Sequence, residues 1–545
     1  MIKNLLDRYR MTKLDQLDWI TRNRLIMKDV IQLEQGKKDG SKHPQSLKIL
    51  CWGVMPWERG GVEHMLATAL RARGHQVFGA QCSGGMSACS MESILYPRPD
   101  CETCTQRHRR LLDIWGLNGL YQGTSQYLSK KDQQEISELV ESLPEGELVE
   151  FQFEGLPVGL LAKNDLAQYF FKLVDLGDPE VKTYYRRALK GLCQFASAAR
   201  KALDTIKPDR AIVTSGRTVA FTAFYQLCRQ RNIPITTWDE SIGGLGAFIF
   251  AKNSYAVDYD KPEAWAKISK EALTDEELQF NHQFFKNTAK GQFGRHRYYD
   301  NPIEDHQEIL SHLGLRSEVP ITVLLTNLTW DTSALGKDIA FESMIHWLVE
   351  SIEFFSHHAD RQLVIRTHPG EGHLATYARG CESVESILRH HFPQLPKNIV
   401  IVSGKEEISS HQLAEMATTI GVYTTSVGLE MAMRGRKVLV CGKSHYRGKG
   451  FTVDIGSKEE YFQEILSQET LEISEAQMRL AHKYAYFFIV RTEVYLDEFN
   501  IEDRHQYRID NPKAFLAGES QRWDELCRNV EEMGDYVDCT GYGGR

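Results

Sequence analysis

Two basic side chains at the end of one apolar run could bind a phosphate. Arg366 and His368 lie at the end of the predicted strand 362–366 and just after it, and Pro369 stops the strand. A guanidinium and an imidazole at a strand end could stabilise the charge on a departing phosphate. The histidine could instead fill a hydrogen-bond network in the loop, and the spacing alone does not separate the two interpretations.

Three successive hydroxyl side chains offer a second anion site. Thr424, Thr425 and Ser426 lie between a predicted strand and a predicted helix. They could cap the helix and, with its free N–H groups, hold an anion. Glu430, one turn into the helix, could reach a ribose diol. Helix capping alone is the alternative, because hydroxyls cap helices in many proteins.

A pair of acids and a pair of glycines each follow a predicted strand in the first half of the chain. Asp239 and Glu240 come after the strand 235–238, and either carboxylate could act as general base toward an acceptor hydroxyl. A solvated acidic turn is the alternative. Gly60 and Gly61 follow the first strand and permit close approach of the backbone to a ligand. Neither a dinucleotide fingerprint nor a P-loop is present in the sequence.

Four of the eleven cysteines lie close together, at Cys82, Cys89, Cys101 and Cys104, and His108 follows. Four thiolates, or three with the histidine, could form a tetrahedral structural zinc site. Reduced thiols in an irregular insertion are the alternative, and neither interpretation makes these residues catalytic. A long chain without an export signal should keep its thiols reduced.

Two series of alternating strands and helices must position these groups. One series precedes residue 261 and the other follows residue 320, with a charged, aromatic-rich segment between them. The pattern predicts an α/β protein with two Rossmann-like, doubly wound domains facing a cleft. Ligands in such sheets bind outside the carboxyl ends of the strands. The D-x-D triplet 258–260 matches a metal pair of single-domain glycosyltransferases, but the duplicated layout argues against that interpretation.

Composition restricts the function further. Among 545 residues, 65 basic against 73 acidic side chains give a net charge of −8, which argues against a nucleic-acid partner. No apolar run reaches the roughly 18 residues that a membrane span needs. We therefore expect a cytoplasmic protein. The amphipathic helix predicted at 1–37 could pack on the body, dimerise or touch the inner face of the membrane, and packing is the default expectation. The oligomeric state stays open.

In order along the chain, these motifs resemble the capsule polysaccharide biosynthesis glycosyltransferases, a family that includes Kdo-transferring capsule proteins. The family's S-T-x-G-L-E, R-G-K-P-V and Y-x-x-x-G elements resemble residues 425–430, 434–438 and 446–450. Its R-x-H-P resembles residues 366–369. The family's Asn-Gly-Arg and acidic turn resemble residues 215–217 and 239–240 in the first half. Two departures are a missing proline after Lys437 and a longer acidic turn, which leaves the base open between Asp239 and Glu240.

The resemblance implies a GT-B fold and a metal-independent glycosyltransferase that uses a CMP- or UDP-sugar and needs no cofactor for the chemistry. Acceptors would be a glycan, a lipid-linked glycan or a small molecule. It implies Asp239, Glu240 and His368 as catalytic residues. It implies donor contacts from Arg366, Thr424, Thr425, Ser426, Glu430 and Lys449, and acceptor contacts from Gly60, Gly61 and Arg217. Rival functions are a nucleotide-sugar 2-epimerase and a non-catalytic nucleotide-sugar-binding protein.

The expected domain organisation follows from the same patterns. Residues 1–44 form a helical extension and linker, and 45–270 form the acceptor-side domain with a cysteine-rich insertion at 82–108. Residues 271–319 connect the domains, 320–470 form the donor-side domain, and 471–545 form a crossing helix and tail.

Overall fold

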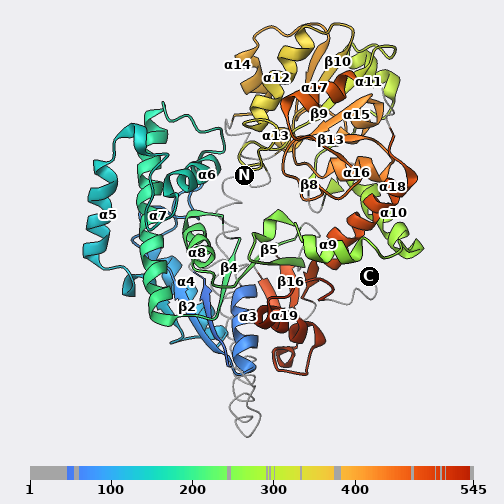
Figure 1. Ribbon diagram of the computed structural model, residues 1–545. Coiled ribbons are helices and arrows are strands. Elements are labelled where there is room, and N and C mark those ends of the chain that lie inside the picture. Colours follow the sequence, from blue (N-terminus) through green and yellow to red (C-terminus); the bar gives the residue numbers. More distant parts are fainter. Residues whose placement is uncertain are drawn as a thin grey trace.

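The structure is a computed structural model, shown in Figure 1, and its described residues form two α/β domains. It describes residues 46–53, 61–215, 217–241, 247–289, 292–293, 296–299, 301–331, 334–373, 382–467, 472–496, 499–503, 506–509 and 511–539. The expected helix at 1–37 and the expected ligand contact Gly60 lie outside these residues.

A seven-stranded sheet forms the first domain. Its strands are β1 (Lys48–Trp52), β2 (Gln76–Gln81), β3 (Tyr121–Gly123), β4 (Arg210–Thr214), β5 (Ile235–Glu240), β6 (Ala247–Lys252) and β15 (Glu493–Tyr495). They lie in the order β15-β6-β5-β4-β1-β2-β3. The five strands from β5 to β3 are parallel, whereas β6 pairs antiparallel with both of its neighbours. The core of the sheet is thus a Rossmann-like unit.

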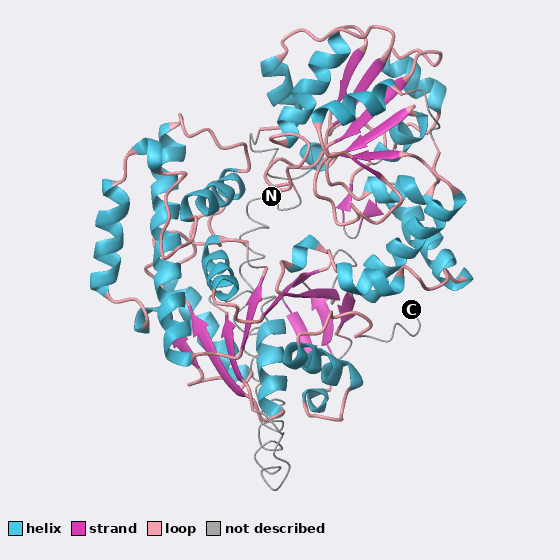
Figure 2. Cartoon of the chain, viewed as in Figure 1, coloured by secondary structure: helices cyan, strands magenta, loops and turns pink. Residues whose placement is uncertain are grey.

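Helices cover both faces of this sheet, as Figure 2 shows. They are α3 (Gly61–Ala72), α4 (Cys101–Ile114), α5 (Lys130–Ser142), α6 (Val158–Phe170), α7 (Pro179–Ile206), α8 (Val219–Gln230) and α19 (Gln521–Glu532). Successive side chains of β1 point to opposite faces of the sheet and so enter two different cores. Leu50 and Trp52 lie in one core, and Ile49 and Cys51 lie in the other. A strand covered on both faces is apolar throughout, which is why this run could be predicted.

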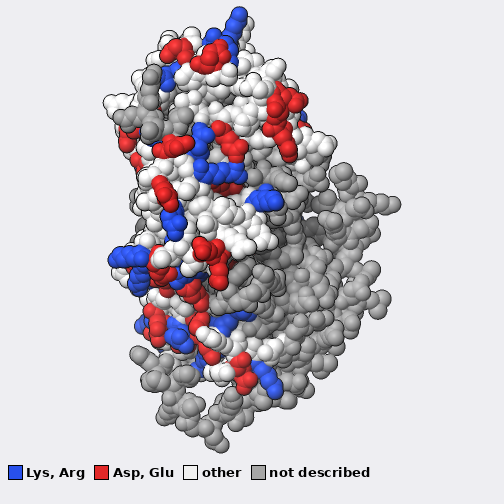
Figure 3. All heavy atoms as spheres, turned by 90° about the vertical axis from the view of Figure 1, so that its right-hand side faces the viewer, with Lys and Arg blue, Asp and Glu red and all other residues white. Residues whose placement is uncertain are grey.

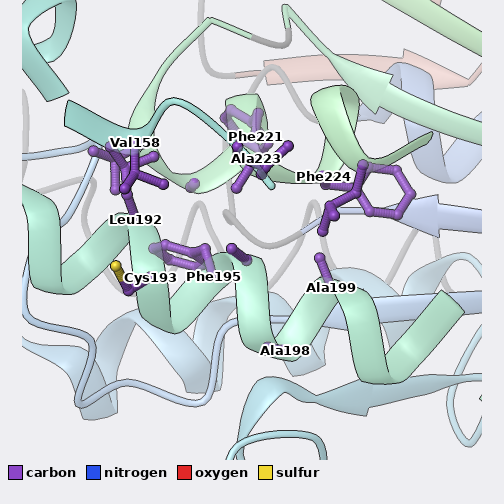
Figure 4. Close-up of a cluster of buried hydrophobic side chains, with 14 of the residues drawn as sticks. Val158, Leu192, Cys193, Phe195, Ala198, Ala199, Phe221, Ala223 and Phe224 are labelled. Atoms are coloured by element: carbon purple, nitrogen blue, oxygen red, sulfur yellow. The ribbon is translucent and has the colours of Figure 1, made fainter. Parts of the chain in front are cut away.

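The long helix α7 carries much of the first core. Asp178 caps its start by accepting a hydrogen bond from the Glu180 N–H at 2.9 Å, and it ends at Lys207 in the left-handed conformation. Small side chains let α8 approach closely. Figure 4 shows Ala199 of α7 facing Phe224 of α8.

The second domain is a six-stranded, wholly parallel sheet. Its strands are β9 (Ile321–Leu325), β10 (Gln362–Arg366), β11 (Ile399–Val402), β12 (Thr419–Val422), β13 (Val438–Val440) and β14 (Val453–Asp454), in the order β11-β10-β9-β12-β13-β14. Its helices are α12 (Met344–Ser356), α13 (Gly370–His373), α14 (Val384–His391), α15 (Ser410–Met416), α16 (Val427–Met433) and α17 (Lys458–Leu466). The predicted α/β fold with two Rossmann-like domains is confirmed.

Helices before and after the second sheet pack together beside it. They are α9 (Pro262–Ile268), α10 (Asp275–Ala289), α11 (His306–Leu313), α18 (Glu475–Tyr486) and the π-helical turn η5 (Phe487–Arg491). Lys483 of α18 donates to Glu277 of α10 at 2.9 Å, with both side chains buried. Two short hairpins, β7 (Gln292–Phe293) with β8 (His296–Arg297) and β16 (Phe499–Asp503) with β17 (Gln506–Ile509), complete the strands.

The C-terminal segment crosses back to the first domain. After η5, strand β15 pairs with β6, and α19 lies beside α3 in Figure 1. Trp523, Phe515 and Tyr536 are buried in the same core as Ile49. Arg73 fastens this junction by donating to the Phe515 carbonyl at 2.7 Å. The first domain is therefore built from both ends of the described chain.

None of the described helices is long and apolar enough to cross a bilayer. On the face drawn in Figure 3, acidic and basic side chains of the described residues are interspersed.

Candidate functional site

A cavity of about 390 Å³ lies at the carboxyl ends of β9 and β10 and the start of α16. In the sheet, β10 and β11 lie on one side of β9 and β12, β13 and β14 lie on the other, so the strand order reverses beside β9. Parallel α/β sheets bind ligands at such a switch point. Its polar and aromatic lining comprises Tyr298, Tyr299, Thr326, Trp330, Asp331, Arg366, Thr367, His368, Ser410, His411, Thr425, Ser426 and Glu430. Five residues predicted from the sequence thus lie around one cavity.

His368 is held in one orientation by the loop that follows it. The Gly370 N–H donates to its Nδ1 at 3.0 Å. A neutral imidazole that accepts at Nδ1 carries its proton on Nε2. The ring of Tyr298 meets the imidazole edge-on, with centroids 5.9 Å apart. His368 can therefore offer an Nε2–H donor to an anion.

Arg366 lies beneath the cavity and is only 1% exposed. Its guanidinium donates to the Ser403 carbonyl, to the Glu406 carbonyl at 3.3 Å and to the Tyr299 hydroxyl at 3.4 Å. Nε is buried and has no hydrogen-bond partner among the described residues. Arg366 thus holds the neighbouring loop while its positive charge stays close to the cavity.

The hydroxyl run does not act as a simple helix cap. Ser426 occupies the N-cap position of α16, but its side chain makes no capping hydrogen bond. Tyr446 fixes the turn by donating to the Thr425 carbonyl at 2.7 Å. A Cβ on Gly428 would lie 2.3 Å from that tyrosine hydroxyl, so only glycine fits there. Thr425 and Ser426 line the cavity, whereas Thr424 lies deeper and donates its N–H to Asn327 at 3.2 Å.

Glu430 forms a buried pair with a histidine that the sequence did not point to. Its Oε2 lies 2.8 Å from Nε2 of His411, and the two side chains are 3% and 9% exposed. The pairing comes from α15 and α16, which begin at the same end of the sheet. Glu430 was predicted to contact ribose, and in the structure it lies at the cavity wall with His411 beside it.

A second carboxyl group lies buried just beyond the Arg366 and His368 motif. Glu371 is 5% exposed and accepts the Val384 N–H at 3.1 Å. Burial raises the pKa of this carboxyl to about 7, and the hydrogen bond from Val384 opposes the shift only in part. Glu371 thus changes charge near neutral pH within contact range of the loop that carries His368.

Aromatic residues and Asp331 complete the cavity and were not found from the sequence. Tyr298 and Tyr299 come from the segment before α11, and Trp330 and Asp331 from the loop after β9. Trp330 also meets Phe171 of the first domain edge to face, with centroids 4.8 Å apart. Stretches of aromatic residues outside a strand or helix carry no periodic signal, so their side chains could be placed only in the folded chain.

The two acids predicted as candidates for the general base lie at the end of β5, in the sheet of the first domain. Asp239 and Glu240 are partly buried, and Asp239 Oδ1 accepts the Glu240 N–H at 2.8 Å. Neither acid lines the cavity, and neither does Tyr259, which lies within electrostatic range of Asp239. The pKa of Tyr259 is held well above the usual value, first by burial and then by the charges of Asp239, Glu493 and Asp331. Carboxylates of both domains therefore lie within electrostatic range of one tyrosine.

Charged pairs join the domains where the D-x-D triplet lies. Asp258 contacts Arg217 and lies 2.7 Å from Nζ of Lys337, and Asp260 lies 2.9 Å from Nζ of Lys449. A second cavity, of about 290 Å³, lies here between the domains. Both aspartates pair with basic side chains, whereas the aspartates of a metal-binding D-x-D motif coordinate a metal ion. Arg217 and Lys449, predicted as acceptor and donor contacts, lie at this junction and do not line the first cavity.

The four cysteines of the insertion come together around a small cavity of about 30 Å³. His108 does not join them. Its Nε2 lies 3.3 Å from Nε2 of His64 in a buried contact, and burial lowers its pKa to about 3. Among the described residues, no group of three or more His, Cys, Asp or Glu side chains could hold a metal ion.

The fold and the cavity together define an α/β protein with two Rossmann-like domains and a cavity at the strand ends of the second sheet. Residues 294–491 match the family described as capsule polysaccharide biosynthesis protein. This range contains the whole cavity, and the resemblance seen in the motifs is confirmed over it. A comparison with curated proteins gave no significant match.

Solved structures show a distant likeness only. A Thermosulfurimonas dismutans KpsC beta Kdo 2,4 transferase is 13% identical, with a TM-score of 0.32, and the match covers 50% of this chain and 79% of that one. The beta Kdo 2,7 transferase of the same protein is 14% identical (TM-score 0.31; 60% and 89% covered). A Neisseria meningitidis UDP-GlcNAc 2-epimerase is 12% identical (TM-score 0.25; 82% and 100% covered). These scores support no conclusion about activity.

Proposed function

We propose that the protein is a glycosyltransferase that moves a sugar from a nucleotide-activated donor to a hydroxyl group of a glycan, lipid-linked or small acceptor. One observation carries the proposal. Arg366, His368, Thr425, Ser426 and Glu430 surround one cavity at the switch point of the second sheet, inside the region that matches the capsule family. A volume of about 390 Å³ lies within the usual range for small-ligand sites.

The donor phosphate would lie between the histidine loop and the start of α16. His368 would donate from Nε2, because its Nδ1 is already an acceptor. Ser426 and Thr425 would donate from their hydroxyls. Arg366 would contribute its charge and its Nε–H from below. Donors placed in this way stabilise the negative charge that grows on the phosphate as the sugar leaves.

Charge in the cavity favours a donor with one phosphate over a donor with two. The described lining residues include one guanidinium, Arg366, and two carboxylic acids, Asp331 and Glu430. A diphosphate would bring a second anionic group into a site with a single permanent cation. A CMP-sugar brings one phosphate charge only. We therefore propose a CMP-activated sugar as the donor.

The acceptor would approach from the first domain. Asp239 or Glu240 would take the proton of the acceptor hydroxyl as its oxygen bonds to the anomeric carbon. The bond from that carbon to the phosphate oxygen breaks in the same exchange, and CMP leaves. Tyr259 supports this placement, because Asp239 and Asp331 both act electrostatically on it. In the proposal, the acceptor hydroxyl lies between these acids of the first domain and the cavity of the second.

Thermal unfolding with CMP, CDP, UDP, GDP and ADP tests the donor site. A ligand at 100 times its Kd stabilises the folded protein by about 2.7 kcal/mol. We expect CMP to raise the melting temperature of the wild-type protein and to have little effect on His368→Ala. His390→Ala, on an exposed part of α14, is the matched control and should respond as the wild type does. Stabilisation by no nucleotide would refute the donor site.

Activity then separates a transferase from its rivals. CMP release from a CMP-sugar should require an acceptor and should fall at least a hundredfold in the variant that loses the base, Asp239→Asn or Glu240→Gln. Both variants should still bind CMP. Conversion of a nucleotide sugar without acceptor would show an epimerase. CMP binding with no turnover in any variant would show a binding protein.

A further inference from the structure

We propose that Glu493 is a positioning residue for the general base, and that this base is Asp239. The inference rests on the proposed function, in which either Asp239 or Glu240 could serve as the base. Glu493 belongs to β15, the strand that returns from the second domain to the edge of the first sheet. Only 1% of its surface is exposed. A carboxyl group buried to this extent needs hydrogen-bond partners, and its partners show what it holds in place.

The register of the sheet separates the two candidate bases. Asp239 of β5 pairs with Ile249 of β6, and Ile249 pairs in turn with Glu493 of β15. Directly paired residues of neighbouring strands point to the same face of a sheet, so Asp239 and Glu493 share one face. Glu240 is the next residue along β5 and therefore points to the other face.

The face that carries Asp239 is turned toward the second domain. Ile249, in the same row, packs in a small cluster with Tyr259. Tyr259 also packs against the core of the second sheet. Burial raises the pKa of this tyrosine, and the charges of Asp239, Glu493 and Asp331 raise it further. Asp239 and Glu493 therefore lie on the side of the first sheet from which the second domain is reached.

The opposite face, which carries Glu240, belongs to the core of the first domain. Phe248 and Val494 lie in the same row as Glu240, and both are buried in the core around Ile49. Residues of α3 and α19 complete this core. We therefore expect an acceptor bound between the domains to meet Asp239 first.

Two hydroxyl groups join Glu493 to its surroundings. The Tyr495 hydroxyl donates to Oε2 of Glu493 at 2.6 Å, and the Ser241 hydroxyl donates to Oε1. Ser241 directly follows the two acids, and its N–H donates to the Ala247 carbonyl at 2.9 Å. Hydrogen bonds to a carboxylate are roughly twice as strong as those between neutral groups. Glu493 thus fixes the end of β5 from β15, two strands away in the sheet.

The direction of the Asp239 carboxylate depends on this anchored backbone. Its Oδ1 accepts the Glu240 N–H at 2.8 Å, so the side chain follows the peptide that Ser241 holds. A reacting group displaced by about 1 Å can lose roughly a hundredfold in rate. The donor cavity is lined by residues of the second domain and contains neither Ser241 nor Glu493. Loss of Glu493 should therefore lower kcat while donor binding persists.

Steady-state kinetics of the full-length protein separate these roles. CMP release is measured with a panel of CMP-sugars that includes CMP-Kdo as donors and with simple methyl glycosides as acceptors. We expect Asp239→Asn to lower kcat at least about a hundredfold, Glu493→Gln about ten- to a hundredfold, and Glu240→Gln by less than about tenfold. The Kd for CMP should not change in any of the three. Glu531→Gln is the control, because this residue of α19 pairs with His75 away from the cleft.

Two further readouts distinguish positioning from a loss of folded protein. Formate added to Asp239→Gly should restore part of the rate, because a small carboxylate can take the proton in place of the missing side chain. Ser241→Ala/Glu493→Gln should lose no more rate than the worse of its single variants, because both substitutions remove the same link. No rescue by formate, or losses that multiply in the double variant, would overturn the proposal.

Hydrogen exchange tests the anchor without any substrate. Glu493→Gln should speed amide exchange in residues 235–241, whereas residues 48–52 of β1 should exchange as in the wild type. Unaltered exchange in residues 235–241, or a fully active Asp239→Asn, would overturn the proposal. Wild-type protein that releases no CMP from any CMP-sugar would instead refute the proposed function, and the exchange rates would still decide whether Glu493 holds the end of β5.

Discussion

Asp258 joins the two domains, because its Oδ1 lies 2.7 Å from Nζ of Lys337 in the second domain and also contacts Arg217 in the first. The three side chains are 22%, 8% and 17% exposed. Burial alone would raise the pKa of Asp258, but the two cations outweigh it and hold the pKa below its usual value. One carboxylate therefore pairs with a cation from each domain.

Asp258→Asn should weaken the contact between the domains. The substitution leaves Arg217 and Lys337 facing each other without an anion, and breaking such a partly buried pair costs roughly 2 to 4 kcal/mol. Chemical denaturation should show this loss at pH 7. Because the pKa of Asp258 is depressed, its stabilisation is present above about pH 4 and lost below it. Asp260→Asn is the matched control: this neighbour is 42% exposed and should cost less than about 1 kcal/mol. Equal losses in both would contradict the assignment.

Glu371→Gln should stabilise the protein at alkaline pH. Burial raises the pKa of Glu371 from 4.5 to about 7. A raised carboxyl pKa contributes stability below about 4.5 that disappears as the pH rises through about 7. At pH 8 glutamine avoids the buried charge, a gain of about 3 kcal/mol at most, and its amide oxygen can still accept the Val384 N–H. Melting curves at pH 4.5 and 8 measure this. A pH-independent difference would rule out the raised pKa as its cause.

Glu430→Gln should weaken binding of CMP about tenfold, since a charge-assisted hydrogen bond to ribose becomes a neutral one. The fold should persist, because the amide keeps an oxygen for His411. Calorimetric titration with CMP measures the change in Kd. Glu415→Gln, a partly exposed residue of α15 that pairs with Arg434, is the control and should leave the affinity unaltered. An unchanged Kd in Glu430→Gln would remove this residue from the ribose site.

Gly428→Ala should disturb the start of α16, and a second substitution should repair part of the damage. The added Cβ would lie 2.3 Å from the Tyr446 hydroxyl. We expect a lower melting temperature and weaker CMP binding. Gly428→Ala/Tyr446→Phe removes the clashing oxygen and should be more stable than the single variant, although it loses the hydrogen bond to Thr425. If the double variant loses more stability than the two single variants lose together, the clash is contradicted.

The local sequence pattern was sufficient to predict the strands and part of the candidate site. Apolar runs such as Ile321–Leu325 are buried on both faces, so their composition alone identifies them. Arg366 and His368 could be selected because a strand end fixes where they lie. The partners of these residues could not be predicted. His411 meets Glu430, and Lys337 meets Asp258, only because separate elements pack together, and sequence spacing does not encode such contacts.

The cysteine cluster shows the same limit of prediction from sequence spacing. The grouping of the four cysteines along the chain suggested a shared site, and the structure places all four around one cavity. His108 was an alternative ligand because it follows Cys104 by one helical turn. In the structure it packs against His64 and Tyr121 and does not line that cavity, and neither neighbour is near it in sequence.

The return of the chain through β15 and α19 bears on how the protein is made. A ribosome completes the second sheet before it has synthesised the last strand of the first, because residues 493–539 come later than β14. The core around Ile49 therefore stays incomplete until residues 493–539 have been synthesised. Nascent chains that stop before residue 493 would present this apolar face to chaperones and proteases, so the core of the first domain closes only once residues 493–539 have been made.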